Sequence, residues 1–308
     1  MRILITGGAG FIGGNLSRAL VGAGHEVVVL DDLSNGSEAN LPSGVHLVRG
    51  SILDLDRVEE ACDQAAAVVH LAARGSVPRS IADPVSTHDV NSTGTLRVLE
   101  GCRAAGVGHV IVASSSSVYG ANPTLPKHED LATAPLSPYA VSKLSTETMA
   151  LAYQRVYDLP TLAFRFFNVF GPLQPAGHVY AAVIPRFVQA ALTSQPVEIH
   201  GDGRQSRDFT YVRSLVNVLV DALERKVTHE GPVNLAFGTR VDLLEVLQLL
   251  GHTAGVPIKR EHVDPRPGDV RHSQADQTRL RSLFPDVEPI SLADGLAETV
   301  SWFRTTLA

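Results

Sequence analysis

The chain has 308 residues, 44% of them apolar, and a formal net charge of −6. This length accommodates one large α/β domain and a smaller lobe. The acidic balance, with no long basic run, excludes a general nucleic-acid surface. Cys62 and Cys102 show no metal-ligand spacing and no reason to pair, which favours a reducing cytoplasm. Because the start is already strand-like and no apolar run could span a bilayer, we expect a cytoplasmic protein without a membrane partner.

The chain begins with an apolar run over residues 2–6, followed by a glycine-rich turn and a helix over 11–23. Gly7 permits a tight turn, Gly10 lets a pyrophosphate approach the backbone, and Gly13 lets the helix pack close to the strand. The helix N-terminus would add free N–H groups and a partial positive charge. Although glycines also mark ordinary turns, these elements in this order predict a dinucleotide site.

A second predicted strand, over residues 26–31, ends in an acidic residue. Asp31 follows Gly10 by about 20 residues, where a carboxylate can bind both hydroxyls of the adenosine ribose. The same carboxylate would repel a 2′-phosphate. The cofactor is therefore predicted to be NAD rather than NADP.

Apolar strands continue to alternate with helices as far as residue 171. A loop over residues 33–44 follows the second predicted strand, and Asp54 can begin the next helix. Further strands are expected at 45–48, 67–71, 109–113 and 161–166, and long helices at 84–105 and 139–157. This alternation predicts an α/β fold with a Rossmann-type, doubly wound parallel sheet. We assign residues 1–171 to an NAD-binding Rossmann domain and 172–308 to a smaller, mainly substrate-binding α/β lobe, interleaved with the first domain.

Two side chains of the expected 139–157 helix favour proton transfer. Tyr139 and Lys143 are four residues apart and so share a face of that helix. An ammonium beside a phenol stabilises the phenolate, which can then act as a general base near neutral pH. Such a pair alone is common in amphipathic helices, but after a dinucleotide turn it indicates a catalytic base.

A run of four serines, residues 114–117, follows the expected strand at 109–113. Ligands of open α/β sheets bind at the carboxyl ends of the strands. A hydroxyl there can bond a sugar oxygen and relay a proton to Tyr139. The residues alone leave open which serine acts.

Further motifs complete a pattern with the glycine turn and the Tyr139/Lys143 pair. They are Val-Val-His-Leu-Ala-Ala at 68–73, Ser-Ser-Ser-Ser-Val-Tyr-Gly at 114–120, Arg-Phe-Phe-Asn-Val-Phe-Gly at 165–171, Gly-Asp-Gly-Arg-Gln-Ser-Arg-Asp-Phe at 201–209 and Arg-Pro-Gly-Asp-Val-Arg-His-Ser-Gln-Ala-Asp at 266–276. Along essentially the whole chain, these motifs resemble the extended short-chain dehydrogenase/reductase family. The greatest similarity is to its NAD-dependent UDP-glucose and UDP-N-acetylglucosamine 4-epimerases.

The resemblance assigns catalysis to Ser115, Tyr139 and Lys143. It implies that NAD is held by Gly7, Gly10, Phe11, Ile12, Gly13, Asp31, Asp32, Asn35, Ser51, Ile52, Leu71, Ala72, Ala73, Asn91, Tyr139, Lys143 and Phe166. Two of these positions depart from the family pattern. Ser51 stands where an acid often meets the adenine, and Phe166 stands where tyrosine is common.

The resemblance also implies a UDP-sugar site. It is formed by Ser76, Ser115, Ser116, Ser117, Asn168, Gln174, Arg186, Arg207, Arg266, Asp269 and Ser273. Arg207 and Arg266 suit this role on chemical grounds, because a diphosphate favours fork-shaped cationic donors. Ser273 falls on the position that controls the room around C2 of the sugar, and its small side chain admits an N-acetyl group.

The implied reaction is epimerisation at C4 through a transient 4-keto sugar. Related dehydratases have an acidic pair where this chain has Ser116 and Ser117, so dehydration is disfavoured but remains an alternative. Arg186 adds a cation that would suit a uronate, which makes a UDP-glucuronate 4-epimerase a second alternative. A non-catalytic NAD-binding protein is a third, although it would not need the serine, tyrosine and lysine together. Because relatives pair through the two long helices, a homodimer is expected.

Overall fold

The computed structural model describes residues 1–177, 181–264 and 271–307. The chain divides into two compact units. Unit 1 contains residues 1–122, 129–166 and 216–234, and unit 2 contains residues 123–128, 167–215 and 235–308. Residues 167–171, expected in the first domain, thus belong to unit 2, and residues 216–234 return to unit 1.

Unit 1 is built on a seven-stranded sheet with the order β11-β6-β5-β4-β1-β2-β3. Its strands are β1 (Arg2–Thr6), β2 (Glu26–Asp31), β3 (His46–Arg49), β4 (Ala67–His70), β5 (Val110–Ser115), β6 (Thr161–Phe166) and β11 (Val233–Leu235). The pairings from β3 across to β6 are all parallel. The predicted Rossmann-type parallel sheet is therefore confirmed.

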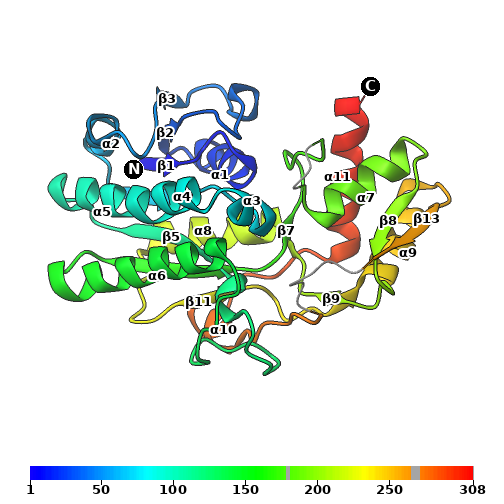
Figure 1. The fold of residues 1–308 in the computed structure, drawn as a ribbon. Coiled ribbons are helices and arrows are strands. Elements are labelled where there is room, and N and C mark those ends of the chain that lie inside the picture. The colour runs from blue at the N-terminus through cyan, green and yellow to red at the C-terminus, as the bar shows by residue number, and fades with distance from the viewer. Residues whose placement is uncertain (178–180, 265–270, 308) are drawn as a thin grey trace. The chain divides into compact units, whose positions relative to one another are not determined.

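The strands are buried on both faces, as their continuous apolar sequences require. Val27 to Leu30 of β2, for example, are fully buried. Helices α2 (Leu55–Cys62), α5 (Gly94–Ala104) and α6 (Pro138–Tyr157) cover one face, and α1 (Phe11–Gly22) and α8 (Val212–Arg225) cover the other (Figure 1). Asp54 caps the N-terminus of α2, as expected.

The long helix expected over residues 84–105 is interrupted. It consists of α4 (Pro84–His88), a π-helical turn at Asp89–Thr93 and α5. The carbonyl of Asn91 in this turn accepts hydrogen bonds from the hydroxyls of Thr95 and Thr146. Polar bonds of this kind accommodate the irregular turn. The short helix α3 (Val77–Ala82) was not predicted.

Unit 2 contains short strands and four named helices in its described part. The helices are α7 (Val183–Leu192), α9 (Leu243–Ala254), α10 (Thr278–Leu283) and α11 (Leu292–Leu307). Three strand pairs join β7 (Val169–Phe170) to β10 (Thr210–Tyr211), β9 (Ser206–Arg207) to β12 (Val241–Asp242), and β8 (Val197–His200) to β13 (Arg260–Val263). Among the described residues of both units, no helix is both long and apolar enough to cross a membrane.

Candidate active site

The glycine-rich turn lies at the carboxyl end of β1 and depends on close backbone approaches. Gly7 has a left-handed φ of +70°, and a Cβ there would lie 2.7 Å from the Cα of Ala72. A Cβ on Gly13 would lie 2.4 Å from the carbonyl oxygen of Gly7. The predicted roles of these two glycines are thus matched by their surroundings, since any side chain would push apart the strand, the turn and the helix.

The space beside Gly10 suits a phosphate. A Cβ on Gly10 would meet one described atom, the carbonyl oxygen of Gly7 at 3.2 Å. Gly10 is also the N-cap of α1, and no side chain caps this helix. The N–H groups of residues 11–13 therefore open a twelve-residue helix without a capping side chain. Such a cradle fits the pyrophosphate of NAD.

Asp31 connects the glycine turn to the loop that follows β2. Its Oδ2 accepts a hydrogen bond from the backbone N–H of Ala9 at 2.9 Å, and its Oδ1 accepts one from Leu33 at 2.8 Å. Burial raises the pKa of Asp31 above its ordinary value, and these two bonds oppose that shift. Each carboxylate oxygen has further acceptor capacity for ribose hydroxyls. The predicted role of Asp31 in NAD binding is compatible with this geometry.

The other predicted NAD residues in unit 1 lie near the same edge of the sheet. Asp32 accepts bonds from Ser34, and Asn35 accepts one from Arg79 at 2.8 Å. Residues 71–73 follow β4 directly, and the N–H of Leu71 bonds the carbonyl of Thr6. Of the remaining positions, Phe11 and Ile12 begin α1, Phe166 ends β6, and Ser51 and Ile52 lie between β3 and α2.

Asn91 fixes the chain after β4 to α6. Its Oδ1 accepts a bond from the N–H of Arg74 at 2.7 Å, and its Nδ2 donates to Ser142 Oγ at 2.9 Å and to the carbonyl of Arg74 at 3.2 Å. Both donor hydrogens of the carboxamide are thereby occupied. In this structure Asn91 orients protein segments that flank the predicted nicotinamide site.

Ser115, Tyr139 and Lys143 come together in unit 1. Ser115 is the last residue of β5, while Tyr139 and Lys143 lie one turn apart near the start of α6. Burial raises the pKa of Tyr139, and a hydrogen bond with Ser115 opposes this shift. Lys143 donates from Nζ to the carbonyl of Ala113 at 2.8 Å. Burial lowers the pKa of Lys143 to about 8, so its ammonium is a poorly solvated charge in this region.

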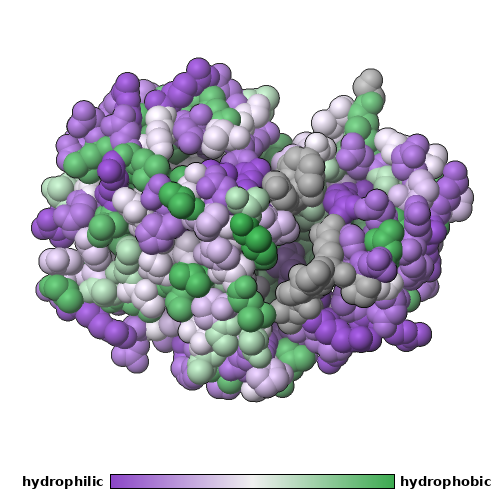
Figure 2. Space-filling view, in the orientation of Figure 1, coloured by the Kyte–Doolittle hydropathy of each residue, from purple (hydrophilic) through white to green (hydrophobic). Residues whose placement is uncertain are grey.

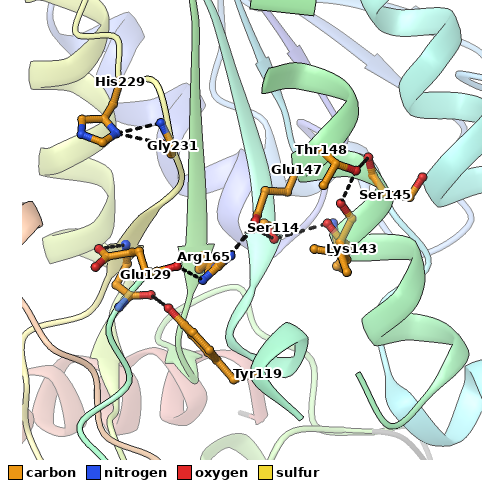
Figure 3. Close-up of polar contacts among 12 residues, drawn as sticks. Ser114, Tyr119, Glu129, Lys143, Ser145, Glu147, Thr148, Arg165, His229 and Gly231 are labelled. Atoms are coloured by element: carbon orange, nitrogen blue, oxygen red, sulfur yellow. Dashed lines mark hydrogen bonds and ion pairs between the residues drawn. The ribbon is translucent and has the colours of Figure 1, made fainter. Parts of the chain in front are cut away.

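A buried polar network that the sequence reasoning missed begins at Ser114, the neighbour of Ser115 in the sequence (Figure 3). Ser114 donates to Glu147 at 2.7 Å, and Glu147 forms an ion pair with Arg165 at 2.7 Å. The guanidinium of Arg165 lies 4.7 Å from the ring centroid of Tyr119. Burial raises the pKa of Tyr119 to about 12, and its hydroxyl donates to Asn234 at 2.7 Å. The position of Glu147, four residues after Lys143, was the one signal that could have revealed this network.

Ser76 and His70 add two features to unit 1. Ser76 caps α3 with a φ of +98°, which is strained for a residue other than glycine. His70 lies between the hydroxyls of Thr6, at 2.7 Å, and Thr95, at 3.0 Å. Burial, followed by the charge of Lys143, lowers the pKa of His70 to about 3. This imidazole is therefore neutral in the folded protein at neutral pH.

Unit 2 contains the other predicted substrate residues. Asn168 donates to the carbonyl of Asp208 at 3.0 Å, and Arg207 donates to the carbonyls of Ser206 and Arg271. Ser273 is half-buried and its N–H bonds the carbonyl of Ser206 at 3.0 Å. Arg266 and Asp269 lie outside the described residues.

Two residues of unit 2 differ in how well they could receive a ligand. Gln174 donates from Nε2 to the carbonyl of Val169, while its buried Oε1 has no partner among the described residues. A buried acceptor of this kind is favourable for a ligand donor. Arg186, in contrast, forms an ion pair with Glu198. Its positive charge is thus balanced within the protein.

Asp208 is a buried carboxylate that the sequence did not single out. It accepts hydrogen bonds from the N–H of Ala275 and the hydroxyl of Thr239, both at 3.0 Å. Burial raises the pKa of Asp208 to about 6. Because Asn168 bonds the carbonyl of the same residue, Asp208 connects three segments around the predicted UDP-sugar residues.

A parallel sheet with a glycine-rich turn after its first strand, a serine at the end of β5 and a Tyr-x-x-x-Lys helix is typical of the short-chain dehydrogenase/reductase class. The model of the NAD dependent epimerase/dehydratase family matches residues 3–236. The chain belongs to this family and is an NAD-dependent enzyme of the isomerase class.

Relatives and solved structures of similar length agree with this assignment. The chain is 38% identical to the UDP-glucose 4-epimerase of Mycolicibacterium smegmatis, over 99% of both proteins. It is 33% identical to a probable UDP-glucuronate 4-epimerase of Rhizobium meliloti, over 98% of this chain and 97% of the relative. The structure of a UDP-N-acetylglucosamine 4-epimerase from Methanobrevibacter ruminantium, in complex with UDP-N-acetylmuramic acid, is 34% identical, with a TM-score of 0.93 and coverage of 99% of this chain and 98% of the other. These similarities leave the sugar open.

Proposed function

We propose that the protein is an NAD-dependent UDP-sugar 4-epimerase that acts on UDP-GlcNAc/UDP-GalNAc, on UDP-Glc/UDP-Gal, or on both pairs. The observation that carries this proposal is the placement of Tyr139 and the buried Lys143 one turn apart near the start of α6, in the same unit as Ser115, which ends β5 and opposes the burial-driven rise in the pKa of Tyr139. This is the arrangement that a hydroxyl-bonded phenolate base requires.

In the proposed reaction Tyr139 acts as the base. Its phenolate accepts the proton of the sugar 4-hydroxyl, and it returns the proton after the sugar has turned its other face. Bound NAD supplies a reversible hydride acceptor. Lys143 stabilises the phenolate by its charge, and Ser115 donates a hydrogen bond to it. The reaction has no net redox change, so one bound NAD serves every turnover.

Two hydroxyls argue against dehydration. Ser116 and Ser117 occupy the positions at which the resemblance assigns an acidic pair to dehydratases. A serine hydroxyl has neither the charge nor the acidity for general acid–base elimination near neutral pH. Ser117 also donates its hydroxyl to Ser115, so its proton is committed within the protein.

Unit 2 supports recognition of a UDP-sugar. We assign Asn168, Gln174 and Arg207 to the UDP moiety, with the unpartnered Oε1 of Gln174 as the clearest sign of a missing donor. Ser273 offers a small, half-buried side chain at the position proposed to face C2 of the sugar. The pairing of Arg186 with Glu198 gives this cation a partner within the protein, with which a uronate would have to compete. UDP-N-acetylhexosamines and UDP-hexoses are therefore preferred over UDP-glucuronate.

The proposed active form is a homodimer. Val85 of α4, Leu96 of α5, and Val156 and Tyr157 of α6 are exposed by 69%, 40%, 68% and 51%. Figure 2 shows apolar side chains on the surface that carries these helices. Large apolar groups on neighbouring helices are typical of an interface. We propose that this surface, the α4–α6 face, joins two copies of the chain.

The experiment that tests the activity uses purified protein and one nucleotide sugar at a time. UDP-GlcNAc, UDP-glucose and UDP-glucuronate are incubated separately, and the anomeric proton signals are followed by NMR. Appearance of the 4-epimer of either of the first two supports the proposal. If neither forms its 4-epimer, the proposal fails. Mass spectrometry of the same samples would show a loss of water if the enzyme were a dehydratase.

A further inference from the structure

The hydroxyl of Ser115 accepts two hydrogen bonds from a single residue, Ser117. Its Oγ accepts one hydrogen bond from the hydroxyl of Ser117 at 2.9 Å and a second from the N–H of Ser117 at 3.2 Å. The cause is the 3₁₀ turn over Ser116–Tyr119, for which Ser115 is the N-cap. This turn brings both donors of Ser117 back onto the end of β5.

Counting donors and acceptors shows which bonding group of the Ser115 hydroxyl is left. A serine hydroxyl has one hydrogen to donate and two lone pairs to accept with. Ser117 fills both lone pairs of Ser115. The bonding group left on Ser115 is therefore its hydrogen, and Ser115 is the side chain whose hydrogen bonding opposes the rise in the pKa of Tyr139. A donor stabilises the phenolate and not the phenol.

We propose that Ser117 is a positioning residue, which occupies both acceptor sites of the Ser115 hydroxyl and so directs its hydrogen to Tyr139. This assignment rests on the proposed function, because it gives Ser117 a part in preparing the base. It also replaces the earlier expectations that Ser117 contacts the substrate and that Ser115 bonds the sugar and relays a proton. Ser115 keeps its hydrogen throughout, and the proton that moves is that of the sugar 4-hydroxyl, which passes to Tyr139.

The side chain of Ser116 offers no equivalent bond. Among the described residues no hydrogen bond of its hydroxyl is found, although it is half-buried like its neighbours. Removing the hydroxyl of Ser117 would leave one acceptor site of Ser115 open. Ser115 could then accept a bond from the phenol, which would stabilise the protonated and inactive form of Tyr139.

The direct test is the titration of Tyr139. Ultraviolet difference spectra at increasing pH are recorded for the wild type, Ser117→Ala and Ser117→Thr, each against the same protein carrying Tyr139→Phe. The chain has six tyrosines, so the subtraction isolates one of them. Ser117→Ala should raise the pKa of Tyr139 by about one unit, which is a tenfold loss of phenolate at a given pH. Ser117→Thr keeps the hydroxyl and should titrate like the wild type.

Epimerase kinetics provide a second readout. In Ser117→Ala the kcat near neutral pH should fall by roughly tenfold with KM nearly unchanged, and the acid limb of its pH profile should move to higher pH. Ser117→Thr should restore both. Ser282→Ala, which removes an exposed hydroxyl of α10, is the matched control and should leave the profile unchanged. Melting curves should confirm that all variants fold.

A wild-type titration of Tyr139 in Ser117→Ala would overturn the inference, and so would a Ser117→Thr variant that behaves like Ser117→Ala. Neither result depends on turnover. If the wild type epimerises no UDP-sugar, the proposed function fails while the titration still decides the role of Ser117.

Discussion

Arg165 and Glu147 form a two-pronged ion pair in the interior of unit 1. Arg165 Nε and Nη2 lie 2.9 and 2.7 Å from the two carboxylate oxygens, and the side chains are 4% and 3% exposed. Burial alone would lower the pKa of Arg165, but its bonds with Glu147 outweigh burial and raise it. The pair joins β6 to α6, and because Glu147 also accepts a bond from Ser114, the same carboxylate ties the end of β5 to α6. The carboxylate of this pair therefore also joins the two elements, β5 and α6, that carry the proposed catalytic residues.

Removal of one partner from this pair should be strongly destabilising. In Glu147→Gln the guanidinium of Arg165 loses its buried counter-charge, and the free energy of unfolding should fall by about 3 kcal/mol. Urea denaturation measures the loss. Glu60→Gln, which breaks an exposed ion pair with Arg57, is the control and should have little effect. Equal effects of the two variants would contradict the assigned role of the buried pair.

The sheet could be predicted from the sequence because the patterns that indicate it lie in short runs of neighbouring residues. Buried parallel strands are short continuous apolar runs, and the glycine turn is a motif of adjacent residues. The buried network is different, because Ser114 and Glu147 are 33 positions apart, and Glu129 bonds Asn234 across 105 positions. No periodicity records such pairs. The interruption at Asp89–Thr93 was missed for the same reason, since it depends on a hydroxyl of α6.

The neutral state of His70 predicts an acid-sensitive fold. Its pKa falls from 6.5 to about 3 on folding, mainly through burial, so between these values the unfolded chain binds more protons than the folded one. Stability should therefore decrease as the pH is lowered through this window, by up to about 5 kcal/mol for this group. Urea denaturation from pH 7 to 4 measures the dependence.

His70→Gln should show a shallower loss of stability over the same pH range. His252→Gln controls for the loss of an exposed imidazole. An unchanged pH dependence in His70→Gln would show that other groups dominate acid unfolding.

Tyr139→Phe should abolish turnover and leave the fold intact. The substitution removes the phenolic oxygen, and a positioned general base contributes roughly 10²- to 10⁴-fold to a rate. Turnover by NMR and thermal unfolding should be measured on the same preparation. Retained NAD binding, followed by calorimetry, would show that the loss is chemical. Activity near that of the wild type would mean that Tyr139 is not the base.

Ser273→Tyr should change the choice of sugar. If Ser273 leaves room at C2, a tyrosine there should reduce kcat/KM for UDP-GlcNAc by at least about tenfold while UDP-glucose is affected less. The ratio of the two kcat/KM values is the quantity to measure. Ser282→Tyr adds the same bulk on an exposed face of α10 and should keep the wild-type ratio. A parallel loss for both sugars in Ser273→Tyr would place this residue away from C2.

A charged side chain placed on the α4–α6 face should prevent formation of the proposed dimer. Val156 is 68% exposed in the isolated chain, and Val156→Glu would place a charge in the proposed interface, where its desolvation opposes association. Sedimentation velocity should show a dimer for the wild type and a monomer for the variant. Leu55→Glu alters a residue of α2 that is 43% exposed and should remain a dimer. Because the proposed catalytic residues all belong to one chain, the monomeric variant should still bind NAD. A wild-type protein that sediments as a monomer would refute the interface.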